Sequence, residues 1–124
     1  MDTKLLFVIA LAAHGLGHII GLMISLNLWG MSVKSSLLES IGLNQGLIMG
    51  LNLIWVIPFI AFIASAWGIW TGATWWQTTG WIGTVFSVLY FVIFWKSFPP
   101  NIPIQANIGN IVALAGLLGI IIIS

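Results

Sequence analysis

The chain has 124 residues, of which 60% are hydrophobic and only 4% are charged, and its net charge is +1 at neutral pH. Soluble domains carry about a quarter charged residues, so this composition excludes an ordinary soluble domain and predicts a protein surrounded by lipid. The weak net charge gives no reason to expect a nucleic-acid partner, and the absence of cysteine excludes disulfides and thiolate metal sites.

Four segments are apolar and long enough to cross a membrane, which takes about 20 mostly apolar residues in a helix. In chain order, the predicted spans are residues 4–26, 47–70, 79–95 and 104–123. Hydrocarbon offers no water to unpaired backbone groups, and four strands cannot close a barrel, so these spans must be helices. The sequence therefore predicts one domain, residues 1–124, with the fold of an all-α integral membrane protein: four transmembrane helices in an up-down bundle.

The first span begins with a lysine and a long apolar run, which is also how a secretory signal begins. Its apolar stretch continues to about residue 28, so we expect a helix that crosses the bilayer. Within it lie His14 and His18, the only two histidines of the chain. An ionisable side chain at membrane depth is costly, and the pair therefore marks a candidate site.

Both histidines share one face of the first helix with small residues, because successive side chains are about 100° apart around a helix. This stripe comprises Phe7, Ala10, His14, Gly17, His18, Gly21 and Ser25. Small residues let membrane helices approach closely, and Gly17 and Gly21 have the spacing of a known helix-packing motif. We therefore expect the stripe to face the interior, with helix packing at its small members: Ala10, Gly17, Gly21 and Ser25.

Turn signals separate the later spans. The first loop, residues 27–46, is expected to form a short interfacial helix within residues 32–40. Pro58 removes an amide donor inside the second span and predicts a kink there. In the third loop, residues 96–103, prolines are predicted to break helices and fix an extended turn: Pro99, Pro100 and Pro103.

The residues at the ends of the spans indicate how the chain sits in the membrane. Tryptophan occurs eight times, and an indole favours the headgroup level, so we interpret most of these residues as an interfacial belt; stacking against a pigment or quinone is the alternative. Five lie near the second loop: Trp67, Trp70, Trp75, Trp76 and Trp81. Lys34 and Lys96 lie in loops on one side, against Lys4 on the other, so the positive-inside rule places both termini outside.

The depth of each polar side chain follows from the rise of about 1.5 Å per helical residue and from the alternating directions of the predicted helices. On this basis we expect two polar layers across the bundle. One consists of His18, Asn52 and Asn110, and the other of His14, Ser87 and Tyr90. The leading interpretation is a structural network, in which hydrogen bonds between these groups fix the register of the helices.

A metal ion is one alternative for the histidine pair. Two imidazoles four residues apart on a helix can bind one ion, as in zinc helices of the HExxH type. Here the catalytic glutamate is missing, and a catalytic zinc site takes three protein ligands. Glu39 would add a ligand only if its loop folded inward. A transition metal at His14 and His18 therefore stays open as a minor interpretation.

Two further alternatives use the same stripe. One histidine can ligate a haem or a chlorophyll-type pigment, with Tyr90, Asn52 and Asn110 supporting it, although His14 and His18 on one helix cannot grip both faces of one haem. Because histidine titrates near neutral pH, the stripe is also a candidate proton pathway or part of a small transporter. Nucleophilic catalysis is not expected, since the serines within the spans have no acid nearby to complete a triad.

The segment from Ala13 to Gly21, with its His14-Gly15-Leu16-Gly17-His18 core, resembles the first helix of a group of small, uncharacterised bacterial four-helix membrane proteins with an HGxGH element. The tryptophan-rich middle and the proline pair before the last span are similar as well. The resemblance implies the same fold and a prokaryotic cytoplasmic membrane. No function is established for the group, so no catalytic residue follows from it.

The chain has no soluble domain, charged site or sizeable loop, and we therefore expect a non-catalytic accessory or structural subunit of a larger membrane complex. Its expected partners are the lipid bilayer and either other membrane subunits or further copies of itself. The alternatives are a cofactor-binding membrane protein with His14 or His18 as ligand, and a small transporter or proton pathway.

Overall fold

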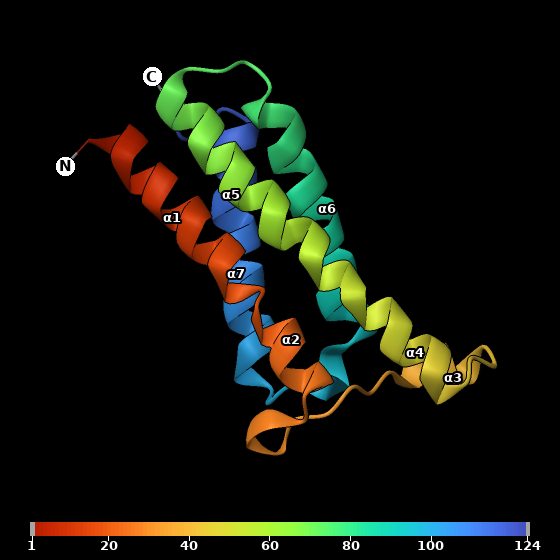
Figure 1. The fold of residues 1–124 in the computed structure, drawn as a ribbon. Helices are drawn as coiled ribbons and strands as arrows, with labels where there is room; N and C mark the ends of the chain where they lie inside the picture. The colour runs from red at the N-terminus through yellow and green to blue at the C-terminus, as the bar shows by residue number, and fades with distance from the viewer. Residues whose placement is uncertain (1, 124) are drawn as a thin grey trace.

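The computed structural model describes residues 2–123, and all regular structure within them is helical (Figure 1). The helices are, in chain order, α1 (Thr3–Gly17), α2 (Ile20–Ser25), η1 (Leu28–Gly30), α3 (Ser36–Ser40), α4 (Gln45–Leu51), η2 (Asn52–Trp55), α5 (Val56–Thr71), α6 (Trp76–Ile93), η3 (Trp95–Ser97) and α7 (Asn101–Leu117), where η denotes a 3-10 helix. Two continuous helical stretches, Thr3–Ser25 and Gln45–Thr71, are long and apolar enough to cross a membrane. The prediction of an all-α protein is confirmed.

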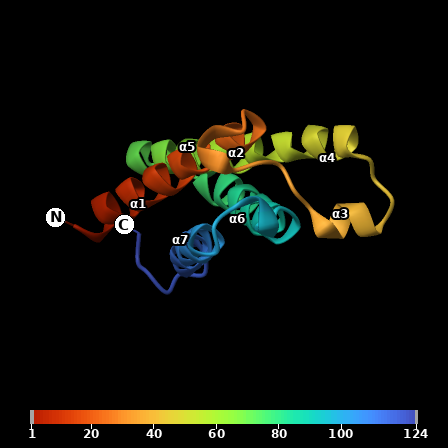
Figure 2. The same cartoon turned by 90° about the horizontal axis from the view of Figure 1, so that it is seen from below.

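The long helical segments lie side by side and alternate in direction, as the colours of Figure 1 show. Seen from below (Figure 2), α1 and α5 form one layer, and α6 and α7 lie beneath it. The contacts are most extensive where α5 packs on α1 and on α6, while α7 contacts α6 and α1. Because α1 therefore lies between α5 and α7, side chains on two of its faces reach different helices.

The first long helix is interrupted near its middle. α1 ends at Gly17 and α2 begins at Ile20, and the N–H groups of His18 and Ile19 each donate to the carbonyl three residues earlier, at 3.1 Å. Such bonds belong to the tighter 3-10 geometry, which often marks a strained or functional point within an α-helix. The break lies at one of the two histidines.

The second long helix is irregular just before Pro58, the predicted position of a kink. Pro58 occupies the first turn of α5, and the preceding turn is the 3-10 segment η2. A proline has no N–H to bond the carbonyl four residues earlier, so regular α-helical bonding ends in the turn that precedes it. The disturbance therefore falls on residues 52–55 and not at Pro58 itself.

Three predicted boundaries need correction. α6 and α7 each begin three residues before the predicted starts of 79 and 104. Pro103 lies in the first turn of α7 and does not break it, because amides in a first turn have no helical partner to lose. α7 ends at Leu117, followed by Gly119 with a φ of +76°, so residues 118–123 are not a continuation of the helix. The short helix predicted within residues 32–40 is confirmed as α3.

Two apolar clusters fill the interior at opposite ends. One lies at the end of the bundle that carries the first and third loops, called the loop end below. It comprises Ile24, Val33, Leu38, Ile48, Trp55, Tyr90, Phe91, Phe94 and Phe98. The other lies toward the termini and comprises Phe7, Leu11, Phe62, Ala66, Ile69 and Ala113. The His18 ring lies 5.8 Å from the Phe62 ring and 5.6 Å from the Phe91 ring, measured between centroids, so the histidines separate the two clusters.

Candidate functional site

His18 lies at the end of α1, where its own N–H donates to the carbonyl of Gly15 and not to that of His14. The His18 ring replaces the missing backbone donor, because its Nδ1 lies 2.8 Å from the His14 carbonyl oxygen. A carbonyl oxygen only accepts, so Nδ1 carries the proton, and in the neutral ring Nε2 accepts a hydrogen bond from the Ser87 hydroxyl at 2.7 Å. His18 is 1% exposed, and both of its nitrogens are used inside the protein.

His14, one turn earlier, is directed toward α7. Its Nε2 lies 2.8 Å from Oδ1 of Asn110, whose amide nitrogen donates to Asn107 at 3.2 Å. That second bond orients the Asn110 oxygen toward the ring, so His14 Nε2 carries the proton and donates. The His14 ring also packs on the Phe62 ring, with 4.7 Å between their centroids. His14 is half-buried, and its Nδ1 forms no hydrogen bond with any residue from 2 to 123.

A third polar joint lies nearer the loop end and connects α2, η2 and α6. Asn52 donates from its amide nitrogen to the Gly21 carbonyl at 2.9 Å and to the Ser25 hydroxyl at 2.6 Å. The Tyr90 hydroxyl donates to the Asn52 oxygen at 2.7 Å. Asn52 and Tyr90 are both 0% exposed, so the bond between them is completely enclosed.

These pairings differ from the two predicted layers. His14 pairs with Asn110, His18 pairs with Ser87, and Tyr90 lies with Asn52 near the loop end. The observed starts of α6 and α7 explain the shifts of Ser87, Tyr90 and Asn110. Because α6 and α7 each start three residues earlier than predicted, each of their side chains lies about one helical turn, roughly 4.5 Å, farther from the starting end.

The small residues of the predicted stripe have different environments. Gly21 is buried against Trp55, and a Cβ atom there would overlap the indole ring. Gly17 is exposed, with no atom within 4 Å of where its Cβ would be, so the packing expected at Gly17 is not found. Gly15, which the pattern did not single out, is the buried one: its Cβ would lie 2.9 Å from that of Phe62. Ala10 and Ser25 are half-buried.

The hydrogen bonds of the histidines bear directly on the metal and haem alternatives. Three of their four ring nitrogens are engaged by protein groups, and His14 Nδ1 is the open one. Within residues 2–123, no group of three or more His, Asp or Glu side chains lies close enough together to hold an ion. Glu39 lines a surface cavity beside Lys34 in the first loop. The arrangement thus offers an incoming ligand one nitrogen, not a chelating pair.

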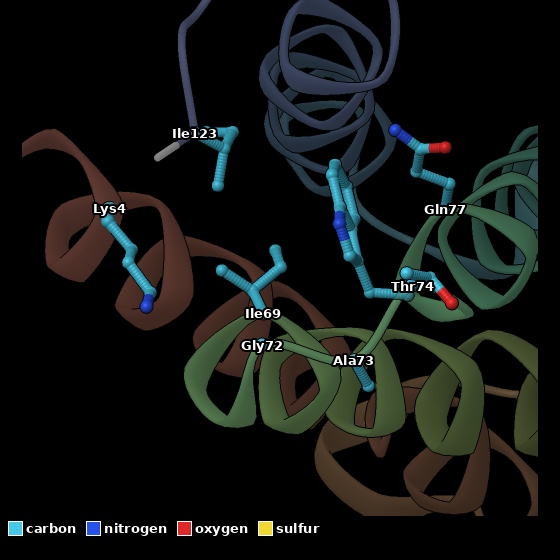
Figure 3. Close-up of a pocket in the computed structure, with 8 residues that line it drawn as sticks. Lys4, Ile69, Gly72, Ala73, Thr74, Gln77 and Ile123 are labelled. Carbon is cyan, nitrogen blue, oxygen red and sulfur yellow. The ribbon is translucent and has the colours of Figure 1, made fainter.

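Two of the cavities that α1 lines also contain polar side chains of other helices or loops. One, of about 220 Å³, is lined by both histidines, Phe91 and Gln105. The other, of about 330 Å³, lies where the two ends of the chain meet, and Figure 3 shows Lys4 and Ile123 on one side of it, across from Thr74 and Gln77. The Lys4 ammonium is therefore not directed at the polar side chains across this second cavity.

The first loop is held by a staple that no pattern in the sequence indicated. The Ser35 hydroxyl donates to the Ile93 carbonyl at 2.7 Å, and Ser97 accepts from the N–H of Lys34 and donates to its carbonyl. Isolated serines in loops carry no recognisable spacing, so only the fold brings these two together. The staple fixes the loop against the end of α6.

The tryptophans near the second loop are mostly on the outside. Trp67, Trp70, Trp75 and Trp81 are between 40% and 63% exposed. Trp76 is half-buried and packs edge-on against Phe7, with 6.3 Å between ring centroids. An outward position agrees with contact to headgroups, whereas Trp76 is part of the interior.

Comparison of the chain with family models, with curated proteins and with solved structures gives no match. The site is therefore characterised by its geometry alone. Three polar joints connect the helices: His14 to α7, His18 to α6, and Asn52 to both α2 and α6.

Proposed function

We propose that this chain is a four-span integral membrane protein that serves as a non-catalytic structural subunit of a larger assembly. The prokaryotic cytoplasmic membrane is the proposed location, on the strength of the resemblance around His14 and His18. The main support for the structural role is that three of the four ring nitrogens of His14 and His18 are bonded to other protein groups, two of them across helices.

The outer surface supports the four-span arrangement. Large apolar side chains are exposed on all the long helices, including Leu16 at 55%, Ile60 at 58%, Val92 at 56% and Ile111 at 64%. Soluble proteins rarely expose apolar area so continuously. α6 has 18 residues and α7 has 17, and a helix of about 17 residues is the shortest that spans hydrocarbon.

The polar joints support a structural role over a catalytic one. Hydrogen bonds between membrane helices contribute about 0.6 kcal/mol on average, so three joints fix the register of the helices more than they stabilise them. A subunit that must present a constant surface to neighbours needs such fixed register. The exposed apolar faces of the long helices are the surfaces available to those neighbours.

The subunit role is tested by extraction of the tagged protein from its native membrane in polymer-bounded lipid discs, followed by mass determination. We expect a complex several times heavier than the 13.5 kDa chain, with other membrane proteins in constant ratio. A lone monomer in several mild extractants would contradict the subunit role.

The four-span arrangement is tested separately, because the chain has no cysteine and accepts single probes. Exposed positions in the first two loops and at the first residue of α7 are suitable: Ser40→Cys, Thr74→Cys and Asn101→Cys. With both termini outside, a membrane-impermeant maleimide applied to intact cells labels position 74 alone, and it labels all three after lysis. Labelling of 40 or 101 in intact cells would contradict the proposed orientation.

A further inference from the structure

The cavity beside the histidines is produced by the way α1 and α7 pack. Toward the termini the two helices touch, because a Cβ atom at Gly109 would overlap the His14 ring and one at Gly116 would overlap Phe7. Toward the loop end the facing residues, Gly17 of α1 and Ala106 of α7, are too small to fill the space between the helices. A cavity of about 220 Å³ remains there. The opening therefore follows from where the small residues stand on the two helices.

The polar groups of the cavity offer hydrogen bonds that the protein does not use. In the neutral His14 ring, Nε2 donates to Asn110, which leaves a lone pair on Nδ1. Among residues 2–123 the fully buried side-chain N or O atom without a partner is Nε1 of Trp55, so His14 Nδ1 is not sealed inside the protein. Gln105 is exposed at the cavity and forms no side-chain hydrogen bond with residues 2–123.

The rest of the lining is apolar and aromatic. Phe91 contributes an aromatic side chain, and Gly17 and Ala106 contribute little more than backbone. A dry cavity of about 150 Å³ holds a benzene ring, so a cavity of this size accommodates a substituted ring. An acceptor on His14 selects a ligand that carries a donor, and an apolar lining selects one that dissolves in lipid.

We propose that this cavity binds the head of a lipid-soluble phenol or alcohol, whose O–H donates to Nδ1 of His14 while its ring lies against Phe91 and its outer edge meets Gln105. This site is independent of the proposed subunit role, because it requires only that the cavity be reached from the lipid phase. In this site Nδ1 of His14 accepts a hydrogen bond from the ligand and does not ligate a metal ion.

The test is a nitrogen NMR titration of the protein, labelled with ¹⁵N-histidine, in lipid nanodiscs. Two histidines give four ring-nitrogen signals, each assigned through its own ring protons. The probes are 2-naphthol and its methyl ether, 2-methoxynaphthalene, which match in ring size and differ in the donor. We expect 2-naphthol to give a saturable shift of the unprotonated His14 Nδ1 signal and the ether to give none. Equal shifts with both probes, or no shift with 2-naphthol, would overturn the proposal.

A pair of glycine variants locates the binding. Gly17→Leu places a side chain in the cavity, and Gly50→Leu is the matched control, since a Cβ atom at either position meets nothing within 4 Å. We expect Gly17→Leu to abolish the 2-naphthol shift and Gly50→Leu to leave it unchanged. Gln105→Ala, at an exposed position, should weaken binding by about fivefold, as expected for one lost hydrogen bond. An unchanged titration in Gly17→Leu would place the ligand elsewhere and contradict the proposal.

Discussion

The surroundings of His18 and His14 differ although both residues lie on one helix, one turn apart. His18 is 1% exposed, and its two nitrogens bridge the freed backbone carbonyl of His14 and the Ser87 hydroxyl. His14 is half-buried and lines a cavity; it bonds α7 through one nitrogen, and its other nitrogen forms no hydrogen bond with residues 2–123. The difference shows that two histidines one turn apart need not share a role, because the environment of each ring is set by the helix it contacts.

The largest expected effect concerns the enclosed histidine. His18→Ala leaves both the His14 carbonyl and Ser87 without their partner and creates a cavity between Phe62 and Phe91. We expect a loss of about 3 kcal/mol in the free energy of unfolding. His14→Ala should cost about 1 kcal/mol, because its site is partly open. Unfolding in mixed micelles, followed by tryptophan fluorescence, measures both, and equal losses would remove the contrast.

The next effect concerns the approach of α7 to His14. Gly109→Ala adds a Cβ atom that would overlap the His14 ring, so the two helices must separate or the ring must leave Asn110. We expect a loss of about 2 kcal/mol, typical of overpacking in a close-packed interior. Gly50→Ala is the control, since its Cβ atom meets nothing. A Gly109→Ala protein as stable as wild type would show that α1 and α7 are not in close contact here.

A smaller effect is expected at the third joint. Tyr90→Phe removes the hydroxyl that donates to Asn52 and leaves a fully buried amide oxygen with one partner fewer. We expect a loss of about 1 kcal/mol, because the ring itself stays packed among Phe91, Phe94 and Phe98. Phe94→Leu, which changes the same cluster without touching a hydrogen bond, separates packing from bonding in the unfolding measurement.

The smallest expected effect is the coupling energy of each histidine with its hydrogen-bond partner. A double-mutant cycle between His14 and Asn110 should give a coupling near 0.6 kcal/mol, the average for polar contacts between membrane helices. The corresponding cycle between His18 and Ser87 should give more, because that bond is fully enclosed. The cycles need unfolding free energies for four proteins each. A larger coupling for His14 would reverse the ranking of the two sites.

Much of the architecture could be predicted from hydropathy. The long apolar segments indicated helices, and the stripe of the first helix placed both histidines toward other helices. The partners of the histidines could not be predicted, since an error of three residues in a helix start moves a side chain by one turn. Hydropathy does not show that Pro103 is compatible with the first turn of α7. It also does not show that the helix ends before Gly119 although the isoleucine-rich segment continues.

The packing of the small residues and the bonding of His18 could not be predicted from the spacing of residues along the first helix. Gly17 and Gly21 have the motif spacing, yet only Gly21 meets a neighbour, because the helix changes geometry at His18 and rotates the later residues relative to the earlier ones. The carbonyl that His18 bonds is free only because of that same change. Side-chain periodicity assumes an unbroken helix, so it fails at this point.

The sequence separations of the two histidine bonds have a consequence for how the protein is made. Ser87 follows His18 by 69 residues, whereas Asn110 follows His14 by 96. On a ribosome that adds about 5–20 residues per second, His18 meets its partner when the third long helix emerges, and His14 stays without Asn110 until the fourth emerges. The bond between His14 and Asn110 thus joins the first and the fourth long helices, and it forms later than the bond between His18 and Ser87.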